Sequence, residues 1–214
     1  LNTALFADEP AQQVPSYGTA SDLAALTAEG LYDYYQMMIQ NDQIDIIVTG
    51  DVDEAAVLAQ WQQAGFEDRL TGRPRPFYQH HNTNQYVEVS EQQALSQAKL
   101  NLGYDLPVFY RGNHYYAALV FNELFGGSPL SKLFMNVREK ASLAYYASSS
   151  LDTFRGVLKV QAGIDGKNHD QVLAIIAAQL TAIQAGDFTD DLVEQLKLGL
   201  INDFESSLDS QRTF

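Results

Sequence analysis

The sequence predicts an α+β sandwich, in which a mainly antiparallel sheet carries helices on one face. Strand-like segments follow one another as meanders and are succeeded by a pair of helices, rather than alternating strictly with helices. The clearest strand alternates Ala98, Leu100, Leu102 and Tyr104 with polar or small residues, as a half-buried antiparallel strand does.

Composition sets limits on the class of protein. An apolar fraction of 46% is typical of globular chains, and a net charge of −14 argues against binding nucleic acid or an anionic membrane surface. No apolar run approaches the roughly twenty residues of a membrane-spanning helix, and no signal-peptide pattern is present. The chain has no cysteine, hence no disulfide or thiol nucleophile. We expect a cytoplasmic protein without membrane insertion. The chain begins at Leu1 and stops at Phe214 just past an amphipathic helix, so we interpret it as a fragment of a longer chain.

The first third of the sequence contains two predicted helices with a strand between them. Residues 1–19 are polar and interrupted by prolines and a glycine, so we expect a loop-like entry. Thr27 and Glu29 indicate the start of a helix, whose shared apolar face comprises Leu31, Tyr34, Tyr35 and Met38. The β-branched run 44–50 ends at a turn glycine and predicts a buried strand. Asp53 then suits the N-cap of a helix that carries Val57, Leu58 and Trp61.

Residues 69–76, RLTGRPRP, are a linker candidate, because they are rich in proline and arginine and lack periodicity. The pattern of strands and helices begins again after them. Residues 114–125 are apolar nearly all round and predict a buried helix. Residues 145–151 and 156–164 are expected to form a hairpin with one apolar face of Leu158, Val160, Ala162 and Ile164. Two amphipathic helices follow, striped by Leu173, Ile176, Leu180 and Ile183 and by Val193, Leu196, Leu200 and Phe204.

A helix–helix–strand corner between these segments is the most informative stretch. Gly126-Gly127 suits a helix C-cap that needs a positive φ, and Ser128 with Pro129 suits the start of the next helix. That helix has one apolar stripe, formed by Leu130, Leu133, Phe134 and Val137. Arg138 and Lys140 lie in its last turn, where cations are favoured, and a strand-like run follows. Taken singly, these residues are ordinary caps and solvated charges.

The whole string resembles the GGxxSRLF…LRE(K)xxLAY signature of the pitrilysin/mitochondrial processing peptidase family, zinc peptidases whose metal motif is His-x-x-Glu-His. The match comprises Gly126-Gly127, the tetrapeptide 131–134 with Lys132 in place of the commoner Arg, the tetrapeptide 137–140, and Leu143-Ala144-Tyr145. The stretch SYGTASDL…LTAEGLYDYY before IVTGDVD is similar to the same family, so the resemblance begins near Tyr17 and indicates a bacterial member.

The resemblance implies a LuxS/mitochondrial-processing-peptidase-like metallohydrolase fold, with two similar α+β units in tandem. On this mapping residues 1–72 are the C-terminal part of the first unit, 73–76 are the linker, and 77–214 form most of the second unit. The sequence shows no internal repeat of its own, so this duplication is taken from the family.

Zinc ligands of the family are not found in this sequence. None of the four histidines, His80, His81, His114 and His169, lies in a His-x-x-Glu-His motif. His80 and His81 are adjacent and would point to opposite sides of an extended chain, so a solvated loop pair is expected. His114 and His169 are expected to cap or pack at helix starts. We therefore expect no metal site or catalytic residue here, with zinc placed upstream in the full-length chain or on a partner.

The resemblance does supply candidate substrate-binding residues. Active members use an Arg and a Tyr seven positions apart to hydrogen-bond the peptide backbone and help stabilise the oxyanion. The matching residues are Arg138 and Tyr145; the alternative is an arginine at a helix end and a tyrosine at a strand start. The turn Gly126, Gly127 and Ser128 is a weaker candidate for lining the substrate chamber, and packing is the favoured role there.

Three functions remain open from the sequence. The first, which we favour, is a peptide-binding subunit that supplies Arg138 and Tyr145 to a zinc site on a homologous partner chain, or within a homodimer. The second is a complete zinc peptidase whose metal motif lies upstream of Leu1. The third is a non-catalytic scaffold or binding protein, because relatives can retain the corner for packing alone.

Overall fold

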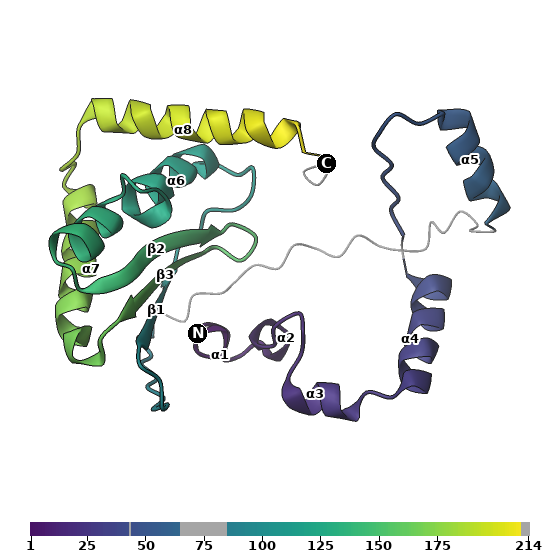
Figure 1. Cartoon of the computed structure of the whole chain (residues 1–214), viewed down its shortest axis with the longest axis horizontal. Helices are drawn as coiled ribbons and strands as arrows, with labels where there is room; N and C mark the ends of the chain where they lie inside the picture. Colours follow the sequence, from purple (N-terminus) through teal and green to yellow (C-terminus); the bar gives the residue numbers. More distant parts are fainter. Residues whose placement is uncertain (43, 65–84, 211–214) are drawn as a thin grey trace. The chain divides into compact units, whose positions relative to one another are not determined.

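The computed structural model describes residues 1–42, 44–64 and 85–210 (Figure 1). The chain divides into two compact units. Unit 1 is Leu1–Val14 with Phe77–Asp203, and unit 2 is Pro15–Pro76 with Phe204–Phe214. Both the linker candidate at 69–76 and the pair His80-His81 lie outside the described residues. The division into 1–72, 73–76 and 77–214 stays a prediction.

Unit 1 contains an antiparallel three-stranded sheet in the order β1-β3-β2 (Figure 1). The strands are β1, Ala98–Asp105, β2, Ala144–Asp152, and β3, Val157–Ile164. In the central strand β3, Ala162 lies opposite Leu100 of β1 and Ala147 of β2. The adjacent residue, Gln161, lies opposite Asn101 and Ser148. Alternation along each strand therefore separates an apolar face from a polar one. The predicted α+β class, the strand at 98–104 and the hairpin are confirmed.

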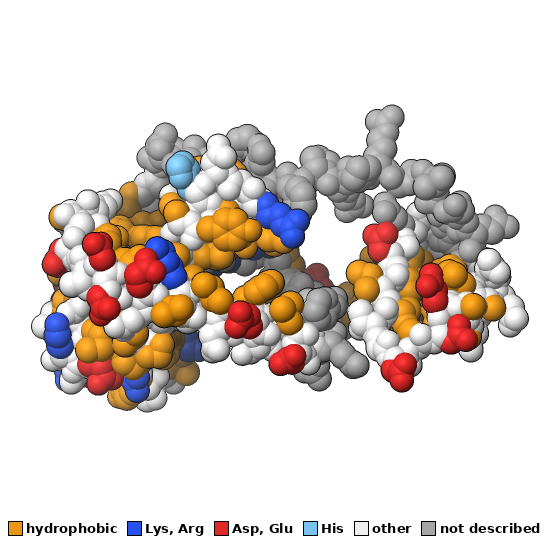
Figure 2. All heavy atoms as spheres, turned by 90° about the horizontal axis from the view of Figure 1, so that it is seen from above, with side chains coloured by type: hydrophobic (Ala, Val, Ile, Leu, Met, Phe, Trp, Pro, Cys, Tyr) orange, Lys and Arg blue, Asp and Glu red, His pale blue; other side chains and the backbone are white. Residues whose placement is uncertain are grey.

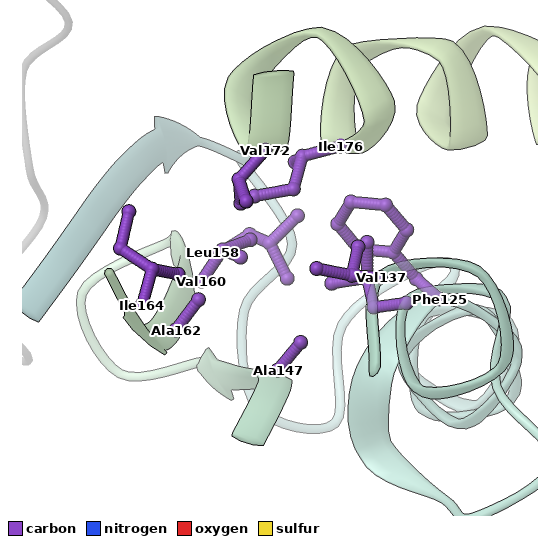
Figure 3. Packing of buried hydrophobic residues seen from close by; sticks show 10 residues of the cluster. Phe125, Val137, Ala147, Leu158, Val160, Ala162, Ile164, Val172 and Ile176 are labelled. Atoms are coloured by element: carbon purple, nitrogen blue, oxygen red, sulfur yellow. The ribbon is translucent and has the colours of Figure 1, made fainter. Parts of the chain in front are cut away.

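The core lies between the apolar face of this sheet and the helices over it (Figure 3). Leu158, Val160, Ala162 and Ile164 of β3 are all buried, as predicted. Val172 and Ile176 of α7, His169–Gln184, point down onto them, while Phe125 and Val137 close the side. Each fully buried aliphatic side chain contributes about 1.5–3 kcal/mol, so this cluster dominates the stability of unit 1.

Two helical segments of unit 1 have π-helical geometry. Helix α6, Tyr115–Asn122, continues into a π-helical turn η1, Glu123–Gly127, and a second π-helical segment η2 spans Phe134–Lys140. After the short 3₁₀ helix η3, Gly166–Asn168, come α7 and α8, Asp190–Leu208. Asp190 and Asp191 lie in the first turn of α8, where the macrodipole favours carboxylates.

The predicted apolar stripes of the last two helices are partly right. In α7, Ile176 is fully buried and Leu180 and Ile183 pack on the core, but the second fully buried residue is Val172 rather than Leu173. In α8 only Leu196 is buried, and Phe204 near the C-terminal end is exposed. The sequence period therefore located the buried face of α7 to within one residue.

The loop-like entry predicted for residues 1–19 is corrected by two single-turn helices, α1, Asn2–Leu5, and α2, Pro10–Gln13. Tertiary packing explains these two helices, because Phe6, which lies between them, is buried. The Arg155 guanidinium lies 5.4 Å from the centroid of the Phe6 ring. Leu5 lies against Gly103 of β1, where a Cβ would be 2.5 Å from the leucine Cδ2.

Unit 2 contains α3, Ala20–Ala25, α4, Ala28–Asn41, and α5, Glu54–Gln63. The predicted caps are confirmed: Thr27 Oγ1 accepts from Gly30 N at 3.1 Å, and Asp53 Oδ1 accepts from Ala55 N at 2.9 Å. The buried strand predicted at 44–50 is wrong for this structure. Its described residues are exposed and unpaired, because no described segment offers them a neighbouring strand.

Candidate functional site

The glycine pair of the corner is explained by close packing rather than by backbone conformation. Neither Gly126 nor Gly127 is among the residues with positive φ, so the predicted left-handed C-cap is wrong. A Cβ on Gly126 would lie 2.5 Å from Ser149 N and 2.9 Å from Leu133 Cδ1. Gly126 is buried against β2, whereas Gly127 is at the surface. The role of the turn in lining a chamber stays a prediction.

The start of the second helix is also displaced from the prediction. Ser128 does not cap it, because its hydroxyl donates back to Glu123 O at 3.0 Å. Residues 128–131 form a turn closed by Ser131 N to Ser128 O at 3.1 Å. The cap is the buried Ser131, whose Oγ accepts from Phe134 N at 3.3 Å. The serine one turn later was missed because Ser128-Pro129 is the stronger local signal.

Side-chain contacts hold the second helix in place over the sheet. Leu133 and Val137 of the predicted stripe are fully buried, while Leu130 is exposed in the turn. Lys132, which replaces the commoner arginine of the signature, forms an ion pair of 3.3 Å with Asp187. Asn136 Nδ2 donates to Gln179 Oε1 of α7 at 2.9 Å. These bonds fix the segment from which Arg138 projects.

Arg138 lies near the end of η2 with a side chain that is 43% exposed. Its guanidinium lies over the Phe134 ring, 4.6 Å from the centroid, and 3.7 Å from Glu139 Oε1. Stacking on Phe134 limits the rotamers of the arginine while leaving donor groups accessible to water. π-Helical turns are rare and are frequent at functional sites. No pattern in the sequence indicates this π-helical turn.

A constrained turn connects Arg138 to the following strand. The carbonyl of Arg138 accepts from Ser142 N at 3.1 Å, and Val137 O accepts from Leu143 N at 3.1 Å. Ser142 adopts a left-handed conformation with φ 52°, which is uncommon for a residue other than glycine. The helix end and the strand start are therefore fixed relative to each other by backbone bonds.

Tyr145 occupies a β-bulge at the start of β2. The register passes from Ala144 opposite Ile164 to Tyr146 opposite Gly163, which leaves Tyr145 as the extra residue. Tyr145 is 65% exposed. The ring of Tyr146 packs directly on Gly163, where any Cβ would collide with it. The bulge thus turns Tyr145 outward while its neighbour stays on the sheet, a distinction that the sequence pattern Tyr-Tyr does not reveal.

Chemically, the corner offers hydrogen-bond donors of two kinds. Arg138 supplies a charged, planar set of N–H groups and Tyr145 a phenolic O–H, both accessible at the junction of η2 and β2. Such groups suit peptide carbonyl oxygens or a developing oxyanion. Glu123 of η1 has its pKa raised by burial, with a further contribution from Asp203, while a hydrogen bond from the Asn122 side chain opposes the shift.

Metal ligation is not supported by the described histidines. His114 lies exposed with φ 67° before α6 and its side chain makes no capping bond, so capping, one of the two roles expected for it, is wrong, while packing at the helix start stays a prediction. His169 Nδ1 is 2.9 Å from Asp170 Oδ1 at the exposed start of α7. In residues 1–42, 44–64 and 85–210 no three His, Asp or Glu side chains gather as a metal site would require. No helix in the same residues is long and apolar enough to cross a membrane.

Comparison with known proteins assigns the class. The family profile described as "Peptidase M16 inactive domain" matches residues 25–200, and the chain belongs to this family of zinc-peptidase relatives. Its sequence is 41% identical over 197 residues to the "Probable inactive metalloprotease YmfF" of Bacillus subtilis, covering 90% of this chain and 45% of that protein. It is 28% identical over 190 residues to the "Uncharacterized zinc protease ML0855" of Mycobacterium leprae, covering 86% and 42%.

Solved structures show the same fold. A conserved protein from Enterococcus faecalis V583 is 46% identical and superposes with a TM-score of 0.92, covering 100% of this chain and 50% of that one. A protease from Helicobacter pylori superposes with a TM-score of 0.75 at 20% identity, over 92% of this chain and 49% of that one. The chain spans about half the length of the relatives it matches.

Proposed function

We propose that this chain is the peptide-binding part of a zinc-peptidase-family subunit that has no zinc of its own. It supplies Arg138 and Tyr145 to a zinc site on a homologous partner chain, in the cytoplasm. The observation that carries the proposal is the pairing of two accessible donors, Arg138 and Tyr145, at one corner that is closed by backbone hydrogen bonds. The inactive family description supports the division of labour.

In this proposal the residues of this chain act on the peptide backbone. The phenol of Tyr145 donates to the scissile carbonyl oxygen, and the guanidinium of Arg138 donates to the same or an adjacent carbonyl. Charge on that oxygen increases as the tetrahedral state forms, so both bonds strengthen in the transition state. The partner's zinc supplies the activated water. Phe134 and the bulge at Tyr145 hold the two donors before substrate arrives, which avoids an ordering cost on binding.

A second candidate is a complete zinc peptidase whose metal motif lies upstream of Leu1. It is favoured by the names of relatives such as the "Uncharacterized zinc protease ML0855", of which this chain covers 42%. The described residues contribute the same two donors under either candidate. A scaffold without peptide chemistry would use neither, and is the outcome that the following experiment would reveal.

The test replaces each donor in the assembled enzyme. Arg138→Ala or Tyr145→Phe should lower kcat/KM for peptide hydrolysis by about 10²–10³, the effect of losing one oxyanion donor, with the melting temperature unchanged. Lys140→Ala and Tyr146→Phe are matched controls, because they alter a cation in the same turn and the adjacent tyrosine. Unchanged turnover in both donor variants, or equal losses in the controls, would contradict the proposal.

A further inference from the structure

An apolar groove lies among the helices of unit 1, and none of its lining residues belongs to the segment 126–145 that carries Arg138 and Tyr145. Its volume is about 430 Å³. It runs between α6 and the start of α8, and its lining includes Tyr116, Val120, Phe121, Phe188, Val193 and Lys197. Lys197 is the one charged residue of that lining, and its ammonium is engaged with Glu194 at 2.6 Å. The groove therefore offers almost entirely apolar contact.

Helix α6 is the reason that an open groove here is unusual. Seven of its eight residues, YYAALVFN, are apolar, and a helix that is apolar all round is normally buried on every side. The sequence accordingly predicts a buried helix. The structure corrects this on one side, because Ala118 is buried toward the sheet whereas Tyr116 is 74% exposed. Hydrophobic side chains are visible at the surface of the molecule in Figure 2.

The relatives indicate where a cover could come from. The chain covers 45% of the Bacillus relative and 50% of the Enterococcus structure, so those proteins contain as much chain again. A second copy is a poorer occupant, because the chain carries a net charge of −14 and two acidic surfaces repel each other. A groove between two helices fits a third helix, whose side chains interlock with both at an interaxial distance of about 8–10 Å.

We propose that, in a polypeptide of the relatives' length, an amphipathic helix from outside residues 1–214 lies in this groove. It packs an i, i+3, i+4, i+7 stripe against Tyr116, Val120 and Val193 and completes the helical layer over the sheet. The groove is thereby an internal docking surface of the full-length protein, separate from the peptide-binding corner.

Cysteine labelling of the full-length gene product tests this directly, because residues 1–214 contain no cysteine. Ala117 lines the groove and is exposed in the structure, and Ala177 on α7 is also exposed and lies outside the lining. Each is changed to cysteine, and the maleimide labelling rate is compared between native and denaturing conditions, with labelling of the parent protein subtracted. Ala117→Cys should be protected about tenfold or more and Ala177→Cys should remain reactive, as expected for local burial.

Native labelling of Ala117→Cys as fast as that of Ala177→Cys would overturn the proposal, since the groove would then be open. A photo-crosslinker attached at position 117 identifies the cover by mass spectrometry. A crosslink to a residue outside 1–214 of the same molecule supports the proposal. A crosslink to a second copy, with protection that disappears on dilution, overturns it in favour of self-association.

Discussion

Tyr145 and Tyr146 illustrate how neighbouring identical residues acquire different roles. The bulge adds one residue to β2, so the two tyrosines do not follow the regular alternation of a strand: Tyr146 is paired in the sheet and Tyr145 is the extra residue. Tyr146 lies on Gly163, and Tyr145 faces solvent next to the turn that follows Arg138. The position of Tyr145 in the candidate site therefore depends on the extra residue of the bulge and on the absence of a side chain at Gly163, which leaves room for the ring of Tyr146.

Gly126 supports the same corner through close approach. We predict that Gly126→Ala destabilises the protein by about 1–3 kcal/mol, because the new methyl group would overpack against the Ser149 backbone and Leu133. Chemical denaturation of the purified protein measures this loss. Gly199→Ala in α8 is the matched control, because nothing lies within 4 Å of its added Cβ, and there we expect a gain of about 0.5–1 kcal/mol. A neutral Gly126→Ala would show that the contact relaxes freely.

At the scale of elements, the helices of unit 2 are capped but not packed. Thr19, Thr27 and Asp53 each accept backbone bonds at a helix start, so local sequence determines where these helices begin. No described residue of α3, α4 or α5 is buried, although the predicted apolar face of α4 is present. Isolated helices of this length are marginal in water, so the faces require a partner layer.

The β-branched run 44–50 also requires a partner, in its case a neighbouring strand with which to pair. Its β-branched residues favour a sheet, yet Ile47 is 77% exposed and the described residues offer no pairing strand. We predict that, in the full-length protein, the amides of residues 44–48 resist hydrogen exchange because they pair with a sheet of the first α+β unit. Amides of β3 serve as the protected reference. Exchange at 44–48 as fast as in an unstructured peptide would contradict both the pairing and the assignment of residues 1–72 to that unit.

For the whole molecule, the decisive quantity is its metal content. The described residues provide no cluster of metal ligands, and the family description is that of an inactive domain. The proposed function places the zinc on a partner chain, so we predict that the full-length chain, purified alone, contains no stoichiometric zinc by elemental analysis, and that a zinc-bearing homologue co-purifies with it from its source. About one zinc per chain would instead favour the complete peptidase, because a structural or catalytic site binds its metal tightly.

Local and periodic signals in the sequence determined most of the elements. The α+β class, the antiparallel hairpin with its buried face, the caps at Thr27 and Asp53 and the carboxylates opening α8 all follow from residues within one or two turns of each other. The signature from Gly126 to Tyr145 also indicated the family from sequence alone. Such signals act over short distances, so they are readable without the fold.

Tertiary structure decided what local signals could not. Ser131 caps in place of Ser128, Gly126 is required by a strand that lies 23 residues away in sequence, and the bulge aims Tyr145 outward. Phe6 turns an expected loop into two short helices because it becomes buried. In each case the controlling contact joins segments distant in sequence, and its energy depends on packing geometry that no local pattern encodes.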